Sequence, residues 1–425
     1  MMIRLVSSSL LGALLWTALP AQAQEQAAPA EAPAAATTAK SKGEYLATVG
    51  NCHSCHTKPG GAPFAGGVPF TTDFGTIYST NITSDPKAGI GDWTKEQFIR
   101  AMREGIDNEG KHLYPAFPYP NFTKVSDEDL NAIYDYIKTV PASTYVPPEN
   151  KMPFPFNQRG LMAFWNALFF KTTRFTPDTQ QSVEFNRGAY IVEGLAHCGA
   201  CHTPRNILGG EKTDLALSGG TFMDEVSKSN EVRPWYAVNL TPSQDGLKAW
   251  KQEDIVSYMK TGHGGRVGSH GPMNEVIAGS TMKWTDEDIA AVATYLKGLK
   301  PIERGSTQAK FSDRELGRAD TVYTIHCGTC HLPTGMGSTP GNELGAPLVG
   351  NPVVQGDDPS SLINVILYGV QVISPAPPKG WQNMKAFDNV LDDDEVAMIA
   401  NYIRTQWGNK GSKVTEEQVE KQRLN

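Results

Sequence analysis

Three pentapeptides of one pattern decide how this sequence is interpreted: Cys52-His53-Ser54-Cys55-His56, Cys198-Gly199-Ala200-Cys201-His202 and Cys327-Gly328-Thr329-Cys330-His331. Together they contain all six cysteines of the 425-residue chain. A Cys-x-x-Cys pair followed directly by histidine is the attachment pattern of a c-type haem. The two thiols bond to the haem vinyl groups, and the histidine is the proximal ligand of the iron. Zinc sites or disulfides would not repeat this spacing three times with no cysteine left over. The sequence therefore predicts three covalently bound haem c groups.

The amino terminus has the features of a secretory signal. Arg4 precedes an apolar run from Leu10 to Leu19, and Ala21-Gln22-Ala23 follows as a cleavage site. We expect residues 1–23 to be a signal peptide, since the apolar run is too short to span a bilayer. Residues 24–42 are rich in Ala and Pro and are expected to form a flexible tether. Export agrees with haem attachment, which takes place outside the cytoplasm, and it predicts a periplasmic protein.

A second pattern repeats between the first two haem motifs. Asn81-Ile82-Thr83, Gly89-Ile90 and Trp93 recur in the same order as Asn239-Leu240-Thr241, Gly246-Leu247 and Trp250. We interpret the Asn-x-Thr tripeptides as turn residues and not as glycosylation acceptors. Such a self-repeat indicates duplication of one unit.

Each repeat ends with a helix signal. Ser126, Thr285 and Asp392 each have an acidic residue three positions later, which is a capping pattern, and apolar residues then recur at helical spacing. We therefore predict a mainly α fold of three tandem class I-like cytochrome c domains, with long loops around the haems. The expected ranges are domain 1 at 43–145, a linker with an aromatic segment at 146–180, domain 2 at 181–300, domain 3 at 308–409 and a polar tail at 410–425.

The sixth iron ligand has a methionine candidate in two of the three domains. In domain 3 we favour Met384, because Met336 lies close to the haem motif and Met398 falls inside the last helix. In domain 2 we favour Met273, in the loop from Ser269, over Met282. A methionine ligand raises the haem reduction potential.

Domain 1 has no methionine in the corresponding loop, which reads His112-Leu113-Tyr114-Pro115-Ala116-Phe117-Pro118-Tyr119-Pro120. Met102 and Met259 each lie nine residues after the repeated tryptophan, and we interpret them as matched core residues. His112 is then the loop side chain able to bind iron, which predicts bis-histidine ligation by His56 and His112. A five-coordinate haem and a ligand from another segment remain open.

The linker contains an aromatic segment from Phe154 to Lys171, which is flanked by basic residues and too short to span a membrane. It is either an interfacial helix lying in the lipid headgroup region or a helix packed against protein. The net charge of −7 and the scattered basic residues argue against a nucleic-acid partner. No nucleophile or proton-transfer constellation is evident in the sequence, so substrate chemistry is expected on another chain.

Beyond these motifs, the whole mature chain resembles the tri-haem cytochrome c subunits of periplasmic, membrane-bound dehydrogenases of acetic acid bacteria. The resemblance is carried by the three haem motifs, the Asn-x-Thr…Gly-x…Trp repeats, Cys201-His202-Thr203-Pro204-Arg205-Asn206, Tyr114-Pro115, Gly271-Pro272-Met273 with Glu275-Val276, and the segment 159–170. It implies that the chain takes electrons from a catalytic dehydrogenase subunit and delivers them to ubiquinone at the outer face of the cytoplasmic membrane. Met273 and Met384 match ligand positions of the family. A likeness of Gly345-Ala346-Pro347-Leu348 to mono-haem cytochromes c makes the Pro347 carbonyl a candidate acceptor for the ring N–H of His331.

The catalytic subunits of this family hold either pyrroloquinoline quinone, in alcohol dehydrogenases, or a molybdenum cofactor, in aldehyde dehydrogenases. Alcohol-type members have methionine where this chain has Phe117, and the departure favours the molybdenum type. Because position 117 is phenylalanine, the methionine that serves the family as distal ligand of this haem cannot be assigned here. Two other classes of function stay open, a multi-haem peroxidase and a free periplasmic electron carrier.

Overall fold

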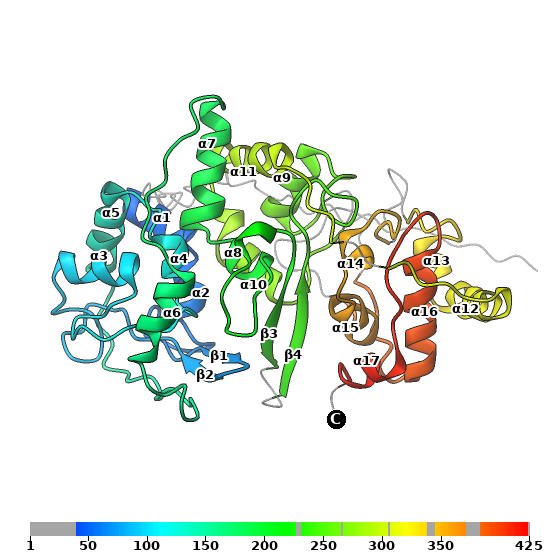
Figure 1. The fold of residues 1–425 in the computed structure, drawn as a ribbon, viewed down its shortest axis with the longest axis horizontal. Coiled ribbons are helices and arrows are strands. Elements are labelled where there is room, and N and C mark those ends of the chain that lie inside the picture. The colour runs from blue at the N-terminus through cyan, green and yellow to red at the C-terminus, as the bar shows by residue number, and fades with distance from the viewer. Residues whose placement is uncertain are drawn as a thin grey trace, which may run out of the picture. The chain divides into compact units, whose positions relative to one another are not determined.

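The computed structural model describes residues 40–226, 231–264, 267–304, 307–337, 345–370 and 383–423. The predicted signal peptide and almost all of the predicted tether lie outside the described residues. We use module 1, 2 and 3 for the ranges 43–145, 181–300 and 308–409. Figure 1 shows the elements of the chain. Module 1 contains α1 (Lys42–Val49), α2 (Cys52–His56), β1 (Pro69–Thr72), β2 (Gly75–Tyr78), α3 (Lys95–Glu104), α4 (Tyr119–Phe122) and α5 (Asp127–Ile137), and α6 (Leu161–Phe169) follows in the linker.

Module 2 repeats this order with additions, and module 3 consists of helices in the part of it that the structure describes. Module 2 contains α7 (Val183–Tyr190), the π-helix η1 (Ile191–Leu195), α8 (Gly199–His202), the 3-10 helix η2 (Thr213–Leu215), β3 (Gly220–Val226), β4 (Glu231–Ala237), α9 (Gln252–Thr261), α10 (Pro272–Gly279), the 3-10 helix η3 (Thr281–Lys283) and α11 (Asp286–Gly298). Module 3 contains α12 (Asp313–His326), α13 (Gly328–His331), α14 (Pro352–Gln355), α15 (Ser360–Tyr368) and α16 (Asp393–Thr405), and α17 (Glu416–Glu420) follows. The prediction of a mainly α fold is confirmed.

In each module the first helix contacts the last one, as α1 with α5, α7 with α11 and α12 with α16. In modules 1 and 2 a glycine permits the close approach. A Cβ on Gly43 would lie 2.0 Å from the Ala132 carbonyl oxygen, and one on Gly188 would lie 2.0 Å from that of Ala291. The last helices begin where the sequence indicated. Ser126 and Thr285 each accept a hydrogen bond from the backbone N–H three residues later, and Asp392 forms a capping box.

The distance along the sequence from the contact glycine to the haem motif is one residue longer in module 2 than in module 1. Gly43 lies nine positions before Cys52, whereas Gly188 lies ten positions before Cys198. The additional residue falls where α7 continues as the π-helix Ile191–Leu195. A π-turn accommodates one extra residue without ending the helix. Both haem motifs therefore follow the glycine contact at equivalent places in the fold.

The Asn-x-Thr tripeptides form buried turns, as interpreted from the sequence. The Asn81 amide accepts hydrogen bonds from the backbone N–H and hydroxyl of Thr83 at 2.9 and 2.7 Å and donates to the Ser143 and Tyr145 carbonyls. Asn239 makes the same pair of bonds with Thr241, at 2.9 and 2.7 Å. Both asparagines are buried, which leaves no room for a glycan. These turns fix the loops that face the haem motifs.

Modules 1 and 2 share one hydrophobic core, which runs from Leu46 through Ile133 and Val192 to Leu296. Module 3 has a separate core around Tyr323, Leu367 and Ile399. The sequence suggested three separate small domains. The shared core instead makes the first two repeats one packing unit, because apolar side chains of both are buried against each other.

A reciprocal pair of tyrosine–aspartate hydrogen bonds joins modules 1 and 2. The Tyr45 hydroxyl donates to Asp288 at 2.7 Å, and the equivalent Tyr190 hydroxyl donates to the equivalent Asp129 at 2.6 Å. Arg187 adds two bonds to Asp288, at 2.7 and 2.8 Å. Burial raises the pKa of Asp288, but the bonds from Arg187 and Tyr45 outweigh burial and hold that pKa below its usual range. Each repeat thus donates from its tyrosine to the aspartate of the other repeat. This reciprocal pairing indicates that the two repeats are related by approximate two-fold symmetry.

Two antiparallel hairpins were not expected from the sequence. The hairpin of β1 and β2 belongs to module 1, and the longer one of β3 and β4 belongs to module 2. Strand β4 contacts α15 of module 3, where the Tyr236 N–H donates to the Ser361 hydroxyl and that hydroxyl donates to the Tyr236 carbonyl, both at 2.9 Å. The hairpin therefore joins module 2 to module 3.

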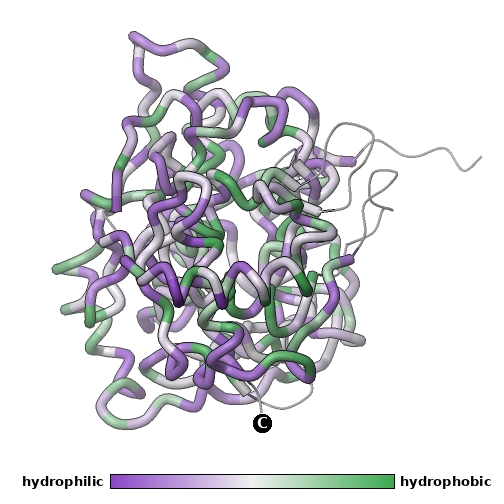
Figure 2. The backbone as a smooth tube through the Cα atoms, turned by 90° about the vertical axis from the view of Figure 1, so that its right-hand side faces the viewer, coloured by the Kyte–Doolittle hydropathy of each residue, from purple (hydrophilic) through white to green (hydrophobic). Residues whose placement is uncertain are grey.

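No helix among the described residues is long and apolar enough to cross a membrane. Figure 2 shows apolar and polar positions interleaved along the chain, as expected for helices with one buried side.

We predict that Asp288→Asn lowers stability by about 2 to 3 kcal/mol at neutral pH, since a charged hydrogen-bond acceptor is lost from a buried network. The folded-state pKa of Asp288 is depressed. The contribution of Asp288 to the stability of the folded state is therefore present at pH values above the ordinary aspartate pKa of about 4. It is lost as the pH falls below that value. Thermal unfolding of the haem-loaded chain, followed by circular dichroism, should show a gap between wild type and variant that narrows from pH 7 to pH 3.

The exposed neighbour Glu287 provides the control, and Glu287→Gln should unfold with the wild type at both pH values. An Asp288→Asn variant as stable as wild type at pH 7 would contradict the role given to this interface.

Candidate haem-binding sites

The three haem motifs occupy equivalent positions, each on a short helix after the first long helix of its module. These short helices are α2, α8 and α13. None of the six cysteines, all of which lie in the described residues, is bonded to another. Both cysteines of each motif are therefore available for the two thioether bonds of a c-type haem.

Each proximal histidine is held by a backbone carbonyl. The ring Nδ1 atoms of His56, His202 and His331 lie 2.6, 2.7 and 2.8 Å from the carbonyl oxygens of Thr80, Val238 and Ala346. Burial lowers the pKa of all three histidines, which favours the neutral ring. A neutral ring that donates from Nδ1 presents the lone pair of Nε2, the atom required for iron.

The carbonyl acceptors explain the sequence repeat in part. Thr80 and Val238 each come directly before an Asn-x-Thr turn, so the buried asparagine fixes the peptide that holds the histidine. In module 3 the expected acceptor, the Pro347 carbonyl, is wrong by one residue. The Ala346 carbonyl takes this place, while the Pro347 carbonyl accepts the side-chain amide of Asn351 at 3.0 Å.

Module 2 contains an apolar cavity with a volume of about 230 Å³. Cys198, Cys201, His202 and Met273 all line it. Trp235 and Trp250 also line the cavity, and their indole N–H groups are buried without a hydrogen-bond partner in the chain. Buried donors without a partner are rare in proteins. An apolar pocket with two unpaired donors fits a haem, whose ring is apolar and whose propionates accept hydrogen bonds.

The cavity narrows the choice of sixth ligand in module 2. Met273 borders it, whereas Met282 does not. Met259, interpreted as a core residue, belongs to the shared core and also reaches the cavity. His270 borders the cavity as well, and the sequence reasoning did not consider it. Its ring lies 5.8 Å from that of Trp235, and Nδ1 lies 3.2 Å from the Gly268 carbonyl oxygen. Met273 remains our choice, with His270 as its rival.

The distal loop of module 1 corresponds to that of module 2. The Leu113 N–H donates to the Gly105 carbonyl at the end of α3, as the Ser269 N–H donates to that of Gly262 at the end of α9. Phe117, four residues on, therefore takes the place of Met273. Its ring packs 5.4 Å from that of Phe122, in the shared core.

His112 lies in the same loop and is half-buried. Its Nδ1 atom is buried without a hydrogen-bond partner, which leaves a ring nitrogen available to a bound group. Its carbonyl accepts a 2.6 Å bond from Arg159. Bis-histidine ligation by His56 and His112 stays a prediction.

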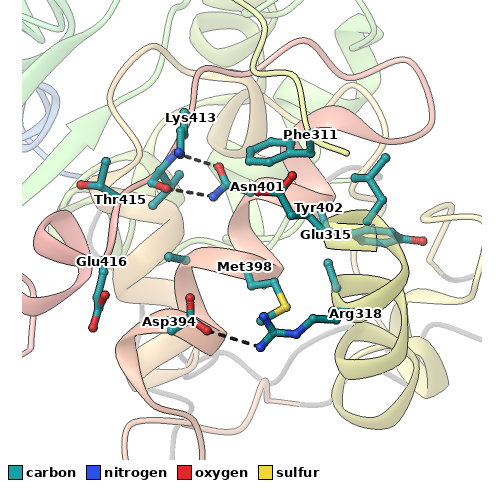
Figure 3. A pocket seen from close by; sticks show the side chains of 14 residues that line it. Phe311, Glu315, Arg318, Asp394, Met398, Asn401, Tyr402, Lys413, Thr415 and Glu416 are labelled. Atoms are coloured by element: carbon teal, nitrogen blue, oxygen red, sulfur yellow. Dashed lines mark hydrogen bonds and ion pairs between the residues drawn. The ribbon is translucent and has the colours of Figure 1, made fainter. Parts of the chain in front are cut away.

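In module 3, Met384 is half-buried and packs against the module's core, and its carbonyl accepts a hydrogen bond from the Val370 N–H. Met336 is largely exposed. Met398 was interpreted as core. It contacts the core but also borders a surface hollow, where it lies beside the ion pair of Arg318 and Asp394 (Figure 3). The hollow contains none of the predicted haem residues, so Met384 remains the methionine proposed for haem 3.

Modules 1 and 3 both reach the cavity of module 2. Val49 and Asn51 of module 1 border it, as do Pro352, Val353 and Ser361 of module 3. The wall of the cavity is therefore built by residues of all three modules.

The first two motifs also meet directly. The half-buried His197, which precedes Cys198, has its Nε2 3.3 Å from the carbonyl oxygen of Gly50, two residues before Cys52. Burial, together with the neighbouring Cys52 and Cys201, raises the pKa of the Cys55 thiol to about 12. Cys55 and Cys201 are thus close in space, although nothing in the local sequence indicates it.

We predict that Met273→Ala removes the methionine signature of haem 2, with loss of the methionine-to-iron charge-transfer absorption and a lower midpoint potential. The matched variant His270→Ala should keep both properties, because its ring is expected to shape the cavity without binding iron. Optical redox titration of the purified haem-loaded chain measures both. Loss of the low-spin signature in His270→Ala and its retention in Met273→Ala would reverse the assignment.

Comparison with known families supports the haem sites. The sequence profile of the cytochrome c family matches residues 41–141 and 185–300. The profile described as "cytochrome C oxidase, cbb3-type, subunit III" matches residues 314–403. The matched ranges contain all three haem motifs.

Curated relatives match nearly the full chain. It is 37% identical over 390 residues to the cytochrome c subunit of alcohol dehydrogenase (quinone) from Gluconobacter oxydans (strain 621H), covering 87% of this chain and 78% of that protein. It is 38% identical over 391 residues to the cytochrome c subunit of gluconate 2-dehydrogenase from Pantoea cypripedii, covering 88% and 86%. A third relative, the cytochrome subunit of fructose dehydrogenase from Gluconobacter japonicus, is 34% identical over 416 residues, which cover 90% of this chain and 82% of that protein. With its haem motifs, its cytochrome c fold and these relatives, the chain belongs to the family of cytochrome c subunits of dehydrogenases.

Proposed function

We propose that this chain is the electron-transfer subunit of a periplasmic, membrane-bound dehydrogenase and passes electrons from a catalytic subunit through three haems to ubiquinone. The observation that carries this proposal is the cavity of module 2, which is bordered by residues of all three modules. A continuous path for electrons requires neighbouring haem sites, and a middle site walled by residues of all three modules supports such a path.

When bound, a c-type haem supplies an iron centre that takes up and releases one electron. The residues of this chain hold and tune that centre. The carbonyls of Thr80, Val238 and Ala346 orient the three proximal histidines. The apolar wall of the module 2 cavity excludes water, and the unpaired indole N–H groups of Trp235 and Trp250 are available to haem propionates. A fixed apolar site keeps reorganisation small when the charge changes.

The arrangement supports a route in which haem 2 is the middle centre. Module 1 reaches it through His197 and Gly50, and module 3 through Ser361 and Tyr236. Electrons are then expected to enter at one outer module and to leave at the other.

We favour a catalytic partner that oxidises aldehydes with a molybdenum cofactor. The support is Phe117, which stands where module 2 has Met273 and where alcohol-type members of the family have methionine. An alcohol dehydrogenase with pyrroloquinoline quinone is the second candidate, favoured by the relative from Gluconobacter oxydans, whose name is alcohol dehydrogenase (quinone).

The native complex, purified in detergent, tests this proposal. We expect molybdenum at about one atom per three haems, reduction of all three haems by an aldehyde, and reduction of a short-chain ubiquinone. Removing this chain should abolish quinone reduction, while a dye that takes electrons directly from the catalytic subunit is still reduced. Haems that stay oxidised during turnover would contradict the electron-transfer role. Pyrroloquinoline quinone without molybdenum would contradict only the choice of partner.

His112 provides a separate prediction about haem 1. If His112 is its sixth ligand, His112→Ala converts that haem from low spin to high spin, while haems 2 and 3 keep their spectra. Electron paramagnetic resonance of the oxidised chain distinguishes the two states. His53→Ala is the matched control, because His53 belongs to the same module and is exposed on the attachment helix α2. An unchanged low-spin haem 1 in His112→Ala would exclude this ligand.

A further inference from the structure

Helix α6 has apolar side chains on two sides, and only one of them is packed. On the inner side, the Trp165 indole N–H donates to the Leu208 carbonyl at 2.9 Å, and the Phe169 ring lies against Gly210. Figure 1 shows α6 next to α4, where Tyr119 donates a hydrogen bond to Asn166. The two interpretations of this segment, packed helix and interfacial helix, thus each account for one side of α6.

The outer side of α6 is an exposed apolar stripe. Leu161, Phe164 and Leu168 follow the spacing i, i+3 and i+7, which places them on one face of the helix. Phe164 is 72% exposed and Leu168 is 69% exposed. Exposed aromatic and leucine side chains in a row are unusual on a soluble surface and mark an interaction site.

Two segments next to α6 carry further exposed apolar side chains. Phe154, before α6, is 79% exposed, and Ile207, in the module 2 turn that packs on α6, is 94% exposed. Phe74 connects the segments, since its ring lies 5.1 Å from that of Phe156 and also contacts Gly209. We call this set the apolar docking surface. It consists of Phe154, Leu161, Phe164, Leu168, Ile207 and Leu208.

The segment that contains α6 carries charge of one sign along the sequence. Residues 150–177 contain Lys151, Arg159, Lys171 and Arg174 and neither aspartate nor glutamate, although the whole chain has a net charge of −7. Lys171 and Arg174 are exposed directly after α6. A short apolar stripe flanked by basic residues is the composition of a segment that lies in the lipid headgroup region. A surface for a protein partner is instead depleted in lysine.

We propose that the apolar docking surface inserts into the outer layer of an anionic phospholipid bilayer. This inference rests on the membrane attachment proposed above and assigns it to residues of two modules. The apolar stripe enters the acyl boundary, and the exposed side chains of Lys171 and Arg174 contact lipid phosphates.

Docking in this way brings module 1 to the bilayer. The segment before α6 is tied to the distal loop of that module, since the Tyr114 hydroxyl donates to the Phe156 carbonyl at 2.8 Å. Arg159 donates to the His112 carbonyl and pairs with Asp107 at 3.0 Å. The distal side of haem 1 would then be the haem side closest to a lipid-soluble quinone.

Flotation of the purified haem-loaded chain with vesicles of phosphatidylethanolamine and phosphatidylglycerol tests the proposal. The double variant Phe164→Ser with Leu168→Ser should lose vesicle binding by about tenfold or more, because two apolar side chains no longer enter the lipid. Lys171→Gln with Arg174→Gln should lose the preference for vesicles containing phosphatidylglycerol over neutral ones.

Val183→Ser is the matched control. Val183 is 89% exposed and apolar but lies at the start of α7, outside the surface, so vesicle binding should be unchanged. Haem content and the low-spin spectrum establish folding for every variant. Equal binding by wild type and the stripe variant overturns the proposal. So does a stripe variant that floats normally but no longer copurifies with the catalytic subunit, which would identify a protein interface. Neither result depends on haem reduction in the native complex, which tests the electron-transfer function.

Discussion

The arrangement of the first two haem sites depends on two partly buried hydrogen bonds that the repeats exchange. Tyr45 reaches Asp288, and Tyr190 reaches Asp129, so each repeat donates to the start of the other's last helix. Burial raises the pKa of Tyr190 to about 12, which keeps its hydroxyl protonated as a donor. Because equivalent residues meet, the two modules bury one common core. The same relation brings His197 to Gly50 and the two attachment segments together.

Module 3 is joined differently. Its core is separate, and its contact with module 2 runs through strand β4, where side chains of α15 bond to the strand backbone at Tyr236 and at Pro234. The hairpin also contributes Phe222 and Trp235 to the module 2 cavity. One element therefore both closes the middle haem site and supports the third module, which couples the geometry of the two sites.

The features that could be predicted from the sequence are those formed by residues close together in the chain. The haem motifs, the helix starts at Ser126, Thr285 and Asp392 and the buried Asn-x-Thr turns depend on residues within a few positions of one another. The shared core, the hairpins and the second side of α6 depend on contacts between distant segments, which a single sequence does not reveal. The acceptor of His331 was misplaced by one residue because neighbouring carbonyls in a loop point in different directions. His270 was missed because only the cavity shows that it faces the same space as His202.

The π-turn at Ile191–Leu195 has a consequence for how such proteins evolve. After a duplication, the two copies accumulate insertions independently. A one-residue insertion in the first helix would rotate the rest of that helix, and the haem motif after it, by about a hundred degrees. Confining the extra residue to a widened turn absorbs that rotation before Cys198 is reached. The second copy could thus change in length next to its cofactor while the attachment chemistry, which tolerates no shift in register, was preserved.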